Sequence, residues 1–387
     1  MEELDRLRTQ INEIDRKLVE LYTQRMEVCR AVGQYKKAHD LPVLDAAREK
    51  QVLQSKAALV QQPALRPYVT ALFEQIMAQS RTLQTKLGTA WPPDKERAYA
   101  AYRRAVDHPA ALPDRQRVIY QGQPGAYAEQ AAVAYFGAAC TRTNAKSWEG
   151  VLVAIREGLG EYGVLPIENS STGSINAVYD LLAQYGCAIV GEQIIRVEHA
   201  LMAPKGASLE TICQVYSHEQ GLLQCRPFLA RHPHWIQQAE PNTALAAKLV
   251  AESGDVTKAA IASPRTAGLY GLQVLEEKVN FNDANYTRFV IVADAPQITQ
   301  ACDKVSVVFT VPHTEGSLHR VLAIFATNGR NLLKLESRPI VGKSWEYTFF
   351  ADFSGNLRSE GMDDTIRQLI DETISFRILG NYRAAHI

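Results

Sequence analysis

The beginning of the chain carries a long apolar stripe that is interrupted at one position by an arginine. Leucine, isoleucine and valine recur every three or four residues from Leu4 to Val32, and the single glycine between Leu4 and Leu87 is Gly33. This spacing is typical of a helix of about 35 residues with one apolar face. Two shorter helices cannot cover such a face, so we expect a second copy of the chain to complete an intertwined helical bundle.

Two shorter helices should follow the long one. The pattern predicts them at Asp45–Gln61 and Pro67–Leu87, and Gly88 ends the second of them. We therefore assign 1–88 to an all-α domain. The next residues, 89–115, contain four prolines around a short helical segment, and we interpret them as a linker.

From residue 116 the pattern changes to short β-branched runs that alternate with alanine-rich helices. Segments such as RVIYQG, EYGVLPIEN and TRFVIVA are typical of strands, and SWEGVLVAIREG and NTALAAKLVAESG are typical of helices. This alternation predicts an α/β domain with a parallel sheet over 116–296. Residues 303–383 follow the order strand, helix, strand, strand, helix, strand, which is the α+β ferredoxin-like arrangement.

The composition argues against several classes of function. Lysine plus arginine and aspartate plus glutamate both number 42, so no basic excess favours a nucleic-acid partner. No run approaches the ~18 apolar residues of a membrane span, and the charged start has no apolar signal core. The six cysteines lack metal-ligand spacing, which indicates reduced thiols in a cytoplasmic protein. Without glycine-rich phosphate loops or metal-ligand clusters, we expect no cofactor and no metal.

The arginine in the apolar stripe is Arg25. Taken alone, it could pack its stem against the helix and extend its charged head to water. However, Arg8 and Lys36 lie on neighbouring faces of the same helix, and the second helix adds Arg48. Unpaired cations inside a helical bundle are costly, and the nearby carboxylates are too few to neutralise them. A small dianion held by arginine forks would satisfy the excess charge.

Five short segments between Leu7 and Gln84 resemble the all-helical chorismate mutases. They occur in the family's order and spacing: LRxxI with Arg8, QR with Arg25, VGxxK with Lys36, DxxRE over Asp45–Glu49, and SxxxQ with Ser80 and Gln84. The resemblance implies a Claisen rearrangement of chorismate to prephenate. That reaction needs a compact substrate and stabilisation of negative charge on the breaking ether oxygen, without proton transfer or a covalent intermediate.

The same resemblance implies roles for these residues. Arg25, together with Arg8 of the partner subunit, would bind the two substrate carboxylates. Lys36 and Gln84 would hydrogen-bond the ether oxygen. The remaining residues would orient the substrate, Glu49 through the substrate hydroxyl and Ser80 at one carboxylate: Asp45, Arg48, Glu49 and Ser80.

Four clusters in the α/β region, GQPGAYAE, PIENSSTGSI, YSHEQGLLQC and NYTRFV, could simply be turns, helix caps and a strand start. At strand ends of one α/β unit they would instead converge on a cleft, where helix N-termini at Ala126 and Ser174 would suit a carboxylate. Across Arg117–Ala293 they resemble the prephenate dehydratase family, most clearly in PIENSxxGSI and in the triplet Thr287-Arg288-Phe289. The resemblance implies two α/β lobes hinged around a cleft, as in periplasmic binding proteins.

That family removes carbon dioxide and the ring hydroxyl from prephenate to give phenylpyruvate, and aromatisation drives the reaction. The chemistry needs an acid for the departing hydroxide and a dry pocket. Thr287 would hydrogen-bond the departing oxygen. The resemblance adds further residues to the pocket: Glu168, Asn169, Ser170, Ser217, Gln220, Gln224 and Phe289. His218 is a weaker candidate, because a structural hydrogen bond explains it equally well.

Two alternatives stay open from the sequence. The loop GQPGAY, with Ala126 and Ala128, is common in plant arogenate dehydratases, whereas the attached mutase makes prephenate and so favours prephenate as the substrate. A non-catalytic amino-acid sensor would also combine a cleft with a regulatory tail. Such a sensor would need neither Thr287 nor the mutase residues.

The tail resembles the ACT regulatory domain of the same enzymes. Its ESRP motif matches in full, and GSLH stands where the family usually has GALV. The resemblance implies that phenylalanine binds between two tails of a dimer and inhibits the dehydratase. The implied contacts are Gly316, Ser317, Leu318, Glu336, Ser337, Arg338 and Pro339. The order mutase, dehydratase, ACT resembles the bifunctional enzymes of phenylalanine biosynthesis.

Overall fold

The computed structural model of the chain describes residues 2–88, 91–113, 116–282, 284–340, 342–343 and 345–386, apart from the side chain of Ala46. These residues form two compact units. The first unit comprises 1–103, 310–329 and 360–376, and the second comprises 104–309, 330–359 and 377–387. Both ends of the predicted linker, 89–90 and 114–115, lie outside the described residues.

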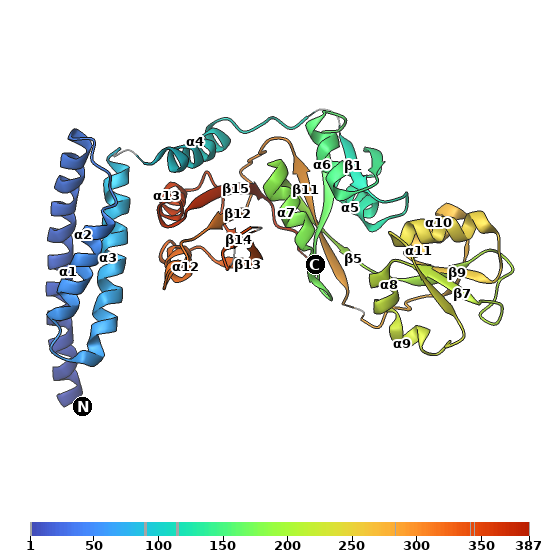
Figure 1. Cartoon of the computed structure of the whole chain (residues 1–387), viewed down its shortest axis with the longest axis horizontal. Helices are drawn as coiled ribbons and strands as arrows, with labels where there is room; N and C mark the ends of the chain where they lie inside the picture. Colours follow the sequence, from blue (N-terminus) through green and yellow to red (C-terminus); the bar gives the residue numbers. More distant parts are fainter. Residues whose placement is uncertain are drawn as a thin grey trace. The chain divides into compact units, whose positions relative to one another are not determined.

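The predicted all-α start of the chain is confirmed. Its helices are α1 (Glu2–Ala38), α2 (Ala46–Ala58) and α3 (Arg66–Lys86), with a short 3-10 helix η1 (Pro63–Leu65) before α3. Asp45 caps α2, because its carboxylate accepts a hydrogen bond from the backbone N–H of Arg48 at 2.9 Å. Helix α3 packs against both α1 and α2 (Figure 1).

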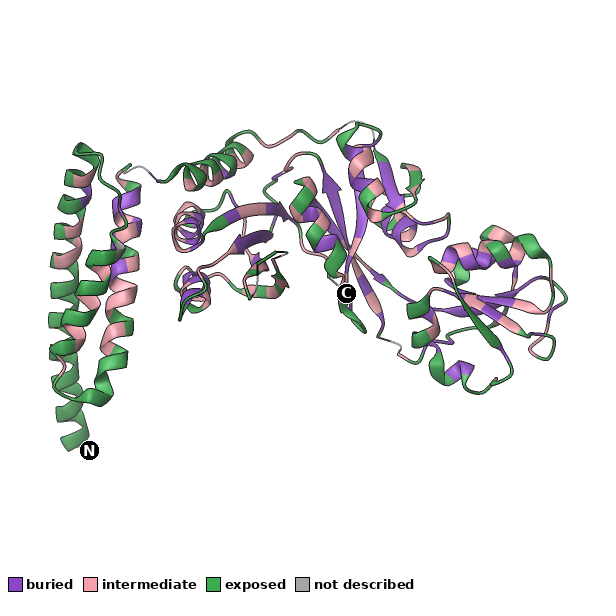
Figure 2. Cartoon of the chain, viewed as in Figure 1, coloured by how far each residue is buried: buried purple, intermediate pink, exposed green. Residues whose placement is uncertain are grey.

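Helix α1 is exposed along most of its length (Figure 2). Its apolar stripe is open, with Ile11 56 %, Ile14 57 % and Leu21 61 % exposed. Near its C-terminal end α1 approaches α3 closely at Gly33, where a Cβ atom would lie 2.9 Å from Cγ of Gln84. The described chain therefore leaves the stripe uncovered while holding the end of α1 firmly against α3.

Helices α12 (Ser317–Thr327) and α13 (Met362–Glu372) belong to the first unit, together with the part of α4 (Pro93–Asp107) that ends at Arg103. Helix α13 packs against both α12 and α3. The indole nitrogen of Trp91 donates to the Asp371 carboxylate at 2.7 Å, and the hydroxyl of Tyr99 donates to the Asp363 carboxylate at 2.8 Å. The sequence analysis assigns α12 and α13 to the C-terminal domain, and in the structure they lie in the same compact unit as the N-terminal helices.

The second unit contains two β-sheets. The larger sheet has ten strands in the order β13-β14-β12-β15-β5-β11-β3-β1-β2, with β4 paired to β3. Its strands are β1 (Arg117–Gln121), β2 (Thr141–Ala145), β3 (Tyr162–Asn169), β4 (Gly173–Ser174), β5 (Ala188–Arg196), β11 (Tyr286–Ala293), β12 (Lys304–Thr310), β13 (Leu332–Pro339), β14 (Tyr347–Ser354) and β15 (Ser375–Tyr382). The smaller sheet has the order β10-β6-β9-β7-β8. Its strands are β6 (Ala200–Ala203), β7 (Gln214–Ser217), β8 (Ile236–Ala239), β9 (Lys258–Ala262) and β10 (Gln273–Glu276).

The expectation of a parallel sheet is wrong, because both sheets are mixed. In the larger sheet β1 runs parallel to β2 and β3, whereas β11 runs antiparallel to β3 and β5. The reason is the path of the chain. After β5 it leaves the larger sheet, builds the smaller sheet from β6 to β10, and returns through β11. The two predicted lobes are confirmed, and two connections join them.

Helices cover the sheets in both lobes. The first lobe has α5 (Tyr127–Phe136), α6 (Trp148–Arg156) and α7 (Asn176–Tyr185), and the second has α8 (Glu219–Gln224), α9 (Arg226–Leu229), α10 (Thr243–Ser253) and α11 (Pro264–Tyr270). The core of the first lobe includes the completely buried side chains of Leu152, Leu165 and Leu182. Among the described helices, none combines the length and apolar character needed to cross a membrane.

The tail follows its predicted element order, β12, α12, β13, β14, α13, β15. Its strands lie in the larger sheet as β13-β14-β12-β15, an order that differs from the order along the chain, as in split βαβ folds. Strand β15 continues the sheet into β5, where Gly380 pairs with Ile189. A Cβ atom on Gly380 would lie 2.0 Å from the carbonyl oxygen of Ile189, so only glycine allows this junction.

Candidate active sites

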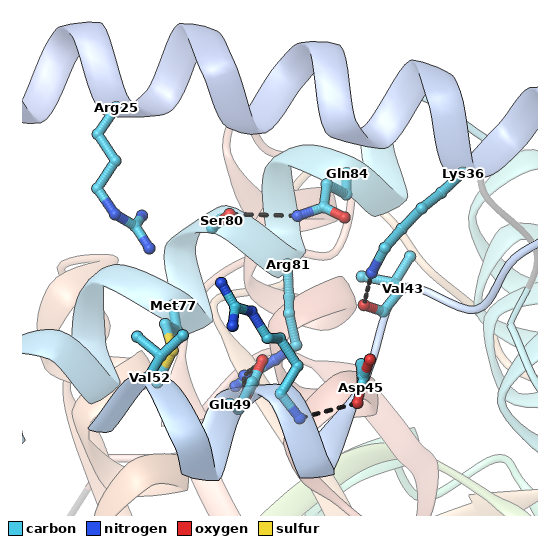
Figure 3. Close-up of a pocket in the computed structure, with 11 residues that line it drawn as sticks. Arg25, Lys36, Val43, Asp45, Glu49, Val52, Met77, Ser80, Arg81 and Gln84 are labelled. Atoms are coloured by element: carbon cyan, nitrogen blue, oxygen red, sulfur yellow. Dashed lines mark hydrogen bonds and ion pairs between the residues drawn. The ribbon is translucent and has the colours of Figure 1, made fainter. Parts of the chain in front are cut away.

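A cavity of about 150 Å³ lies among the three N-terminal helices (Figure 3). Helix α1 contributes Arg25 and Lys36, the start of α2 contributes Asp45, Arg48 and Glu49, and α3 contributes Ser80, Arg81 and Gln84. The structure therefore brings together all of the residues that the mutase resemblance singled out, with the exception of Arg8. Val43, Val52 and Met77 supply the apolar part of the wall.

The charges around this cavity are unbalanced. Its lining contains four cationic side chains and two carboxylates. Glu49 is engaged by Arg81, whose Nη1 donates to both Glu49 oxygens at 2.6 and 2.7 Å. Within the described part of the chain, none of Arg25, Lys36 and Arg48 has a carboxylate partner within 4 Å. An excess of two positive charges is left for a dianionic ligand.

Fixed hydrogen bonds hold the polar groups of the cavity. The ammonium of Lys36 donates to the backbone carbonyl of Val43 at 2.6 Å, which anchors it at the end of the cavity near Gln84 (Figure 3). The side-chain amide of Gln84 donates to the hydroxyl of Ser80 at 3.2 Å, and both side chains are buried. These bonds fix the ammonium of Lys36 and the amide of Gln84 in place before a ligand binds.

Arg8 and Arg81 depart from the sequence prediction in opposite ways. Arg8 is exposed and lies 3.4 Å from Asp5, one turn away on α1, so the single chain does not bring it to the cavity. Arg81 lines the cavity although no motif named it. One signal could have indicated a cation such as Arg81. Glu49 was predicted to lie inside the helical bundle, and a partly buried carboxylate needs a cation beside it.

The second unit contains a larger cavity, of about 670 Å³, which side chains from both lobes line. Five predicted residues line it: Asn169, Gln220, Gln224, Thr287 and Phe289. His218 lines it as well, and its ring nitrogen also accepts a hydrogen bond from the backbone N–H of Gln220 at the start of α8. The motif residues of β3, β11 and α8 therefore converge, although they lie far apart in the sequence.

Three predicted residues do not line this cavity. Glu168 accepts a hydrogen bond from the guanidinium of Arg288 at 2.8 Å. Successive side chains of a strand point to opposite faces, so Glu168 and Arg288 face away from the side on which Asn169 and Thr287 lie. The hydroxyl of Ser170 donates to the carbonyl of Ala284 at 2.9 Å. The hydroxyl of Ser217 donates to the carbonyl of Ile261 at 2.6 Å.

A chain of buried amides orients the hydroxyl of Thr287. The side-chain amide of Asn169 donates to Oγ1 of Thr287 at 3.0 Å and to the amide oxygen of Asn285 at 2.8 Å. Asn285 in turn donates to Gln224 at 3.0 Å. Because Oγ1 of Thr287 accepts the bond from Asn169, its own proton is available to donate into the cavity.

Helix N-termini surround the same cavity. The residues that precede α5, α6, α7 and α10 all line it: Ala126, Ser147, Ile175 and Asn242. Each helix end carries a partial positive charge from its free backbone N–H groups. Neither Ala126 nor Ile175 makes a side-chain capping bond, so no capping side chain competes with a ligand for the first N–H groups of α5 and α7. The sequence predicted two of these ends, at Ala126 and near Ser174, and missed the other two.

His199 and Lys146 line this cavity without having been predicted. The ring of His199 is buried, with one nitrogen 3.1 Å from Gln224 and the other 3.3 Å from the hydroxyl of Tyr127. Burial lowers the pKa of His199 to about 4, so the ring is neutral at pH 7. Neither residue belongs to a recognisable motif, and only the fold places them here. In the described part of the chain, no group of three or more His, Cys, Asp or Glu side chains could hold a metal ion.

The residues implied for phenylalanine occur in both units. In the first unit Gly316 has φ 73° and precedes α12, and the buried hydroxyl of Ser317 lies 2.7 Å from that of Thr314, while Leu318 is half-buried. In the second unit β13 carries the other four. Glu336 accepts a hydrogen bond from the hydroxyl of Ser174, and Arg338 pairs with Asp180 at 2.7 Å. Ser337 and Pro339 are exposed.

The burial of His199 predicts an acid-sensitive second unit. Its folded pKa of about 4 lies below the ordinary value of 6.5, so between these values the unfolded chain binds a proton that the folded chain does not. Stability should therefore fall as the pH drops from 6.5 to 4, by about 3 kcal/mol from this group. We expect His199→Gln to reduce the loss of melting temperature between pH 7 and pH 5. The exposed His234→Gln is the control, and equal pH dependence in both variants would contradict the assignment.

Comparisons with known proteins identify one enzyme family over the N-terminal helices and a second one over the α/β region, in agreement with the two candidate sites. Residues 7–85 match the family Chorismate mutase type II, and residues 118–297 match the family Prephenate dehydratase. The chain is 32 % identical over 387 residues to the bifunctional chorismate mutase/prephenate dehydratase of Enterobacter agglomerans. That match covers 98 % of this chain and 96 % of the relative.

Two solved structures resemble a large part of the chain. The prephenate dehydratase of Arthrobacter aurescens, in complex with L-Phe, has a TM-score of 0.64 and 29 % identity, covering 70 % of this chain and 90 % of its own. GqqA, described as a novel type of quorum quenching acylase, has the same TM-score and identity and covers 70 % and 98 %. Because the Enterobacter relative matches both chains over nearly their full length, the chain belongs to the family of bifunctional chorismate mutase/prephenate dehydratases.

Proposed function

We propose that the cavity among the N-terminal helices converts chorismate to prephenate, and that the cavity between the two lobes converts prephenate to phenylpyruvate. The observation that carries the mutase site is its excess of two positive charges, which matches the two carboxylates of chorismate. The second site is supported by Thr287, whose hydroxyl is oriented by Asn169 and surrounded by helix N-termini.

In the mutase, Arg25 binds a substrate carboxylate, and Lys36 with Gln84 faces the ether oxygen. As the carbon–oxygen bond breaks, negative charge grows on that oxygen, and a fixed ammonium stabilises it more in the transition state than in the substrate. The hydrogen bond from Lys36 to Val43 keeps the ammonium in place before the substrate arrives. Glu49 and Asp45 orient the substrate, so the reaction needs only positioning and fixed charge.

In the dehydratase, the carboxylates of prephenate bind at the helix N-termini and beside Lys146. The bond to the departing carboxylate breaks, its electron pair enters the ring, and the ring hydroxyl leaves as the ring becomes aromatic. Thr287 donates a hydrogen bond to that oxygen while Asn169 supports it from behind. The hydroxide takes up a proton, and the products are phenylpyruvate, carbon dioxide and water.

We propose prephenate rather than arogenate as the substrate, because the mutase on the same chain produces prephenate. A sensor without catalysis would turn over neither compound, so incubating the protein with each one separates the three possibilities. We also propose a cytoplasmic enzyme, since all six cysteines are unpaired in the structure.

We propose that phenylalanine inhibits the dehydratase through the tail. The Arthrobacter relative was solved with L-Phe. In this chain Glu336 of the ESRP motif bonds to Ser174, which lines the dehydratase cavity, so a ligand at β13 would act on the wall of that cavity. The rate of phenylpyruvate formation with and without phenylalanine tests this link, and an unchanged rate would remove it.

Replacing Lys36 by alanine should abolish the mutase and spare the dehydratase. The loss of one charged donor at the ether oxygen should reduce kcat about 100-fold or more. The measurement is the conversion of chorismate, with prephenate turnover by the same preparation as the test of folding. Lys37→Ala removes a neighbouring charge of α1 that does not line the cavity, and it should leave the mutase unchanged. Near-normal mutase activity in Lys36→Ala would refute the assignment.

Replacing Thr287 by valine should eliminate phenylpyruvate formation. Valine keeps the shape of the side chain but cannot donate to the departing oxygen, so we expect a loss of about 100-fold or more in kcat. Thr287→Ser keeps the hydroxyl and should retain much of the activity. Mutase activity should be the same in both variants. A Thr287→Val enzyme that still forms phenylpyruvate would show that the hydroxyl is not needed.

We propose that two chains pair through the exposed apolar stripe of α1, which also brings Arg8 of the partner subunit to each mutase cavity. Ile14→Glu places a carboxylate in the middle of the stripe, where pairing would bury it without a partner. We expect this variant to be monomeric by sedimentation equilibrium and to lose mutase activity. Thr23→Glu adds the same charge to an exposed position off the stripe and should stay dimeric. A dimeric, active Ile14→Glu variant would exclude this interface.

A further inference from the structure

Arg81 connects the mutase cavity to the C-terminal helix α13. One end of its guanidinium binds Glu49 in the cavity, with both carboxylate oxygens within 2.7 Å of Nη1. The other end, Nη2, donates to the carboxylate of Glu372, the last residue of α13. Only 12 % of the Arg81 side chain and 11 % of the Glu372 side chain are exposed, so this pair is largely shielded from water.

The ion pairs continue beyond Glu372 to α12. Nε of Arg320 donates to the second carboxylate oxygen of Glu372 at 3.1 Å, and Nη2 of Arg320 donates to the hydroxyl of Ser317 at 3.1 Å. Positive and negative groups alternate from Arg320 through Glu372 and Arg81 to Glu49. Neighbouring groups in this series are joined by hydrogen bonds, so a change at one end alters the hydrogen-bond partners that are available to the next group.

Glu49 depends on Arg81 for its position. Among the described residues, the guanidinium of Arg81 is the only side chain that hydrogen-bonds the Glu49 carboxylate. Burial alone would lower the pKa of Arg81, but Glu372 and Glu49 outweigh this and raise it, so the side chain stays charged. Without Arg81, a partly buried Glu49 would have to turn towards water or towards the free cations of the cavity.

Arg81 also has space to move. A second cavity, of about 310 Å³, lies on its other side, and Arg81, Glu49 and Met77 line both cavities. The same second cavity is lined by Glu372 and Arg320. Without Glu372, Nη2 would lose its partner, and the guanidinium would be held by Glu49 alone beside this space. Glu372 therefore fixes the end of Arg81 that Glu49 does not hold.

We propose that Arg81 is a positioning residue of the mutase, which fixes Glu49 against the substrate and is itself fixed by Glu372. The geometry of the mutase cavity then depends on α12 and α13, which belong to the tail in the sequence. This inference rests on the proposed role of Glu49 in orienting chorismate. It adds that part of the mutase machinery is supplied by residues near the end of the chain.

Glu372→Gln tests the proposal in the full-length protein. Glutamine keeps the size of the side chain but loses the charge that holds both arginines. We expect KM for chorismate to rise about tenfold, with a smaller change in kcat, because a hydrogen bond to the substrate is misaligned. A merely structural defect would lower the active fraction, and hence kcat, without raising KM. Prephenate turnover should be unchanged.

Asp364→Asn is the matched control. Asp364 also lies on α13 and pairs with α3, through Lys86 at 2.6 Å, but neither residue lines the mutase cavity or the second cavity. This variant loses one ion pair between the same two helices and should keep the KM of the unmodified enzyme. If Asp364→Asn raises KM as much as Glu372→Gln does, the effect is general loosening and the proposal is wrong.

Variants of Arg81 complete the experiment. Arg81→Met should raise KM at least as much as Glu372→Gln, and the double variant should be no worse than Arg81→Met alone, because both changes remove one connection. Arg81→Lys, which keeps a charge, should be intermediate. Additive effects, or an unchanged KM in Glu372→Gln, would overturn the proposal. Glu49→Gln tests the proposed role of Glu49 separately from that of Arg81. If this variant has no effect on KM, the proposed role of Glu49 itself fails.

Discussion

The inward-facing cations of the N-terminal helices are the constraint on which the mutase half of this protein depends. Arg25, Lys36 and Arg48 line a small cavity without carboxylate partners among the described residues. Arg25 and Lys36 are half-buried, so their partial removal from water carries a cost that no carboxylate of the described residues offsets. A dianionic substrate removes that cost when it binds. The empty bundle therefore carries this cost, but its site is already charged and ordered before the substrate binds.

The dehydratase cavity attracts anions in a different way, and the difference fits its chemistry. There the positive potential comes chiefly from the N-termini of α5, α6, α7 and α10, with Lys146 as a charged side chain in the lining. A helix end carries about half of a charge, so it binds a carboxylate less tightly than an arginine fork does. A tightly paired carboxylate would be slow to leave as carbon dioxide. In the mutase both carboxylates stay on the product, and full cations carry no such penalty.

Much of this organisation was predictable from the sequence, because it depends on local pattern. The apolar stripe located the long N-terminal helix, and alternating strands and helices located the two lobes. Strands β2 and β8 were missed because they are short, polar and largely exposed, with little apolar pattern. The mixed direction of the sheets was missed because it follows from the excursion of the chain between β5 and β11. No local window contains that information.

The site residues also divide into those that a local motif reveals and those that only the fold brings together. Residues in contiguous motifs were found, whereas Arg81, Lys146 and His199 enter the cavities only through tertiary packing. The motif PIEN also misled, because neighbouring strand residues face opposite sides of a sheet. Asn169 faces the cavity, and Glu168 faces Arg288 instead. A motif read as letters does not distinguish the residue that binds substrate from the residue that holds the strand.

Arg288 illustrates the role of a residue that holds a strand in place and does not bind substrate. It lies between Thr287 and Phe289, which both line the dehydratase cavity, but its own guanidinium reaches Glu192 at 3.0 Å and Asp352 at 3.1 Å. Asp352 belongs to β14 of the tail, and Lys304 of β12 also reaches Glu192, at 2.9 Å. Burial alone would lower the pKa of Arg288, but these carboxylates raise it, so the charge persists.

This ion cluster makes the tail strands part of the catalytic lobe. The strand that carries Thr287 is fixed on one face by the amides of the cavity and on the other by charges from β12 and β14. Arg288 and Lys304 share the carboxylates of Glu192 and Asp352, so removing one member changes the charge balance around all the others. A displacement of the tail sheet therefore cannot be absorbed locally. It must either break buried ion pairs or move the strand on which the dehydration chemistry depends.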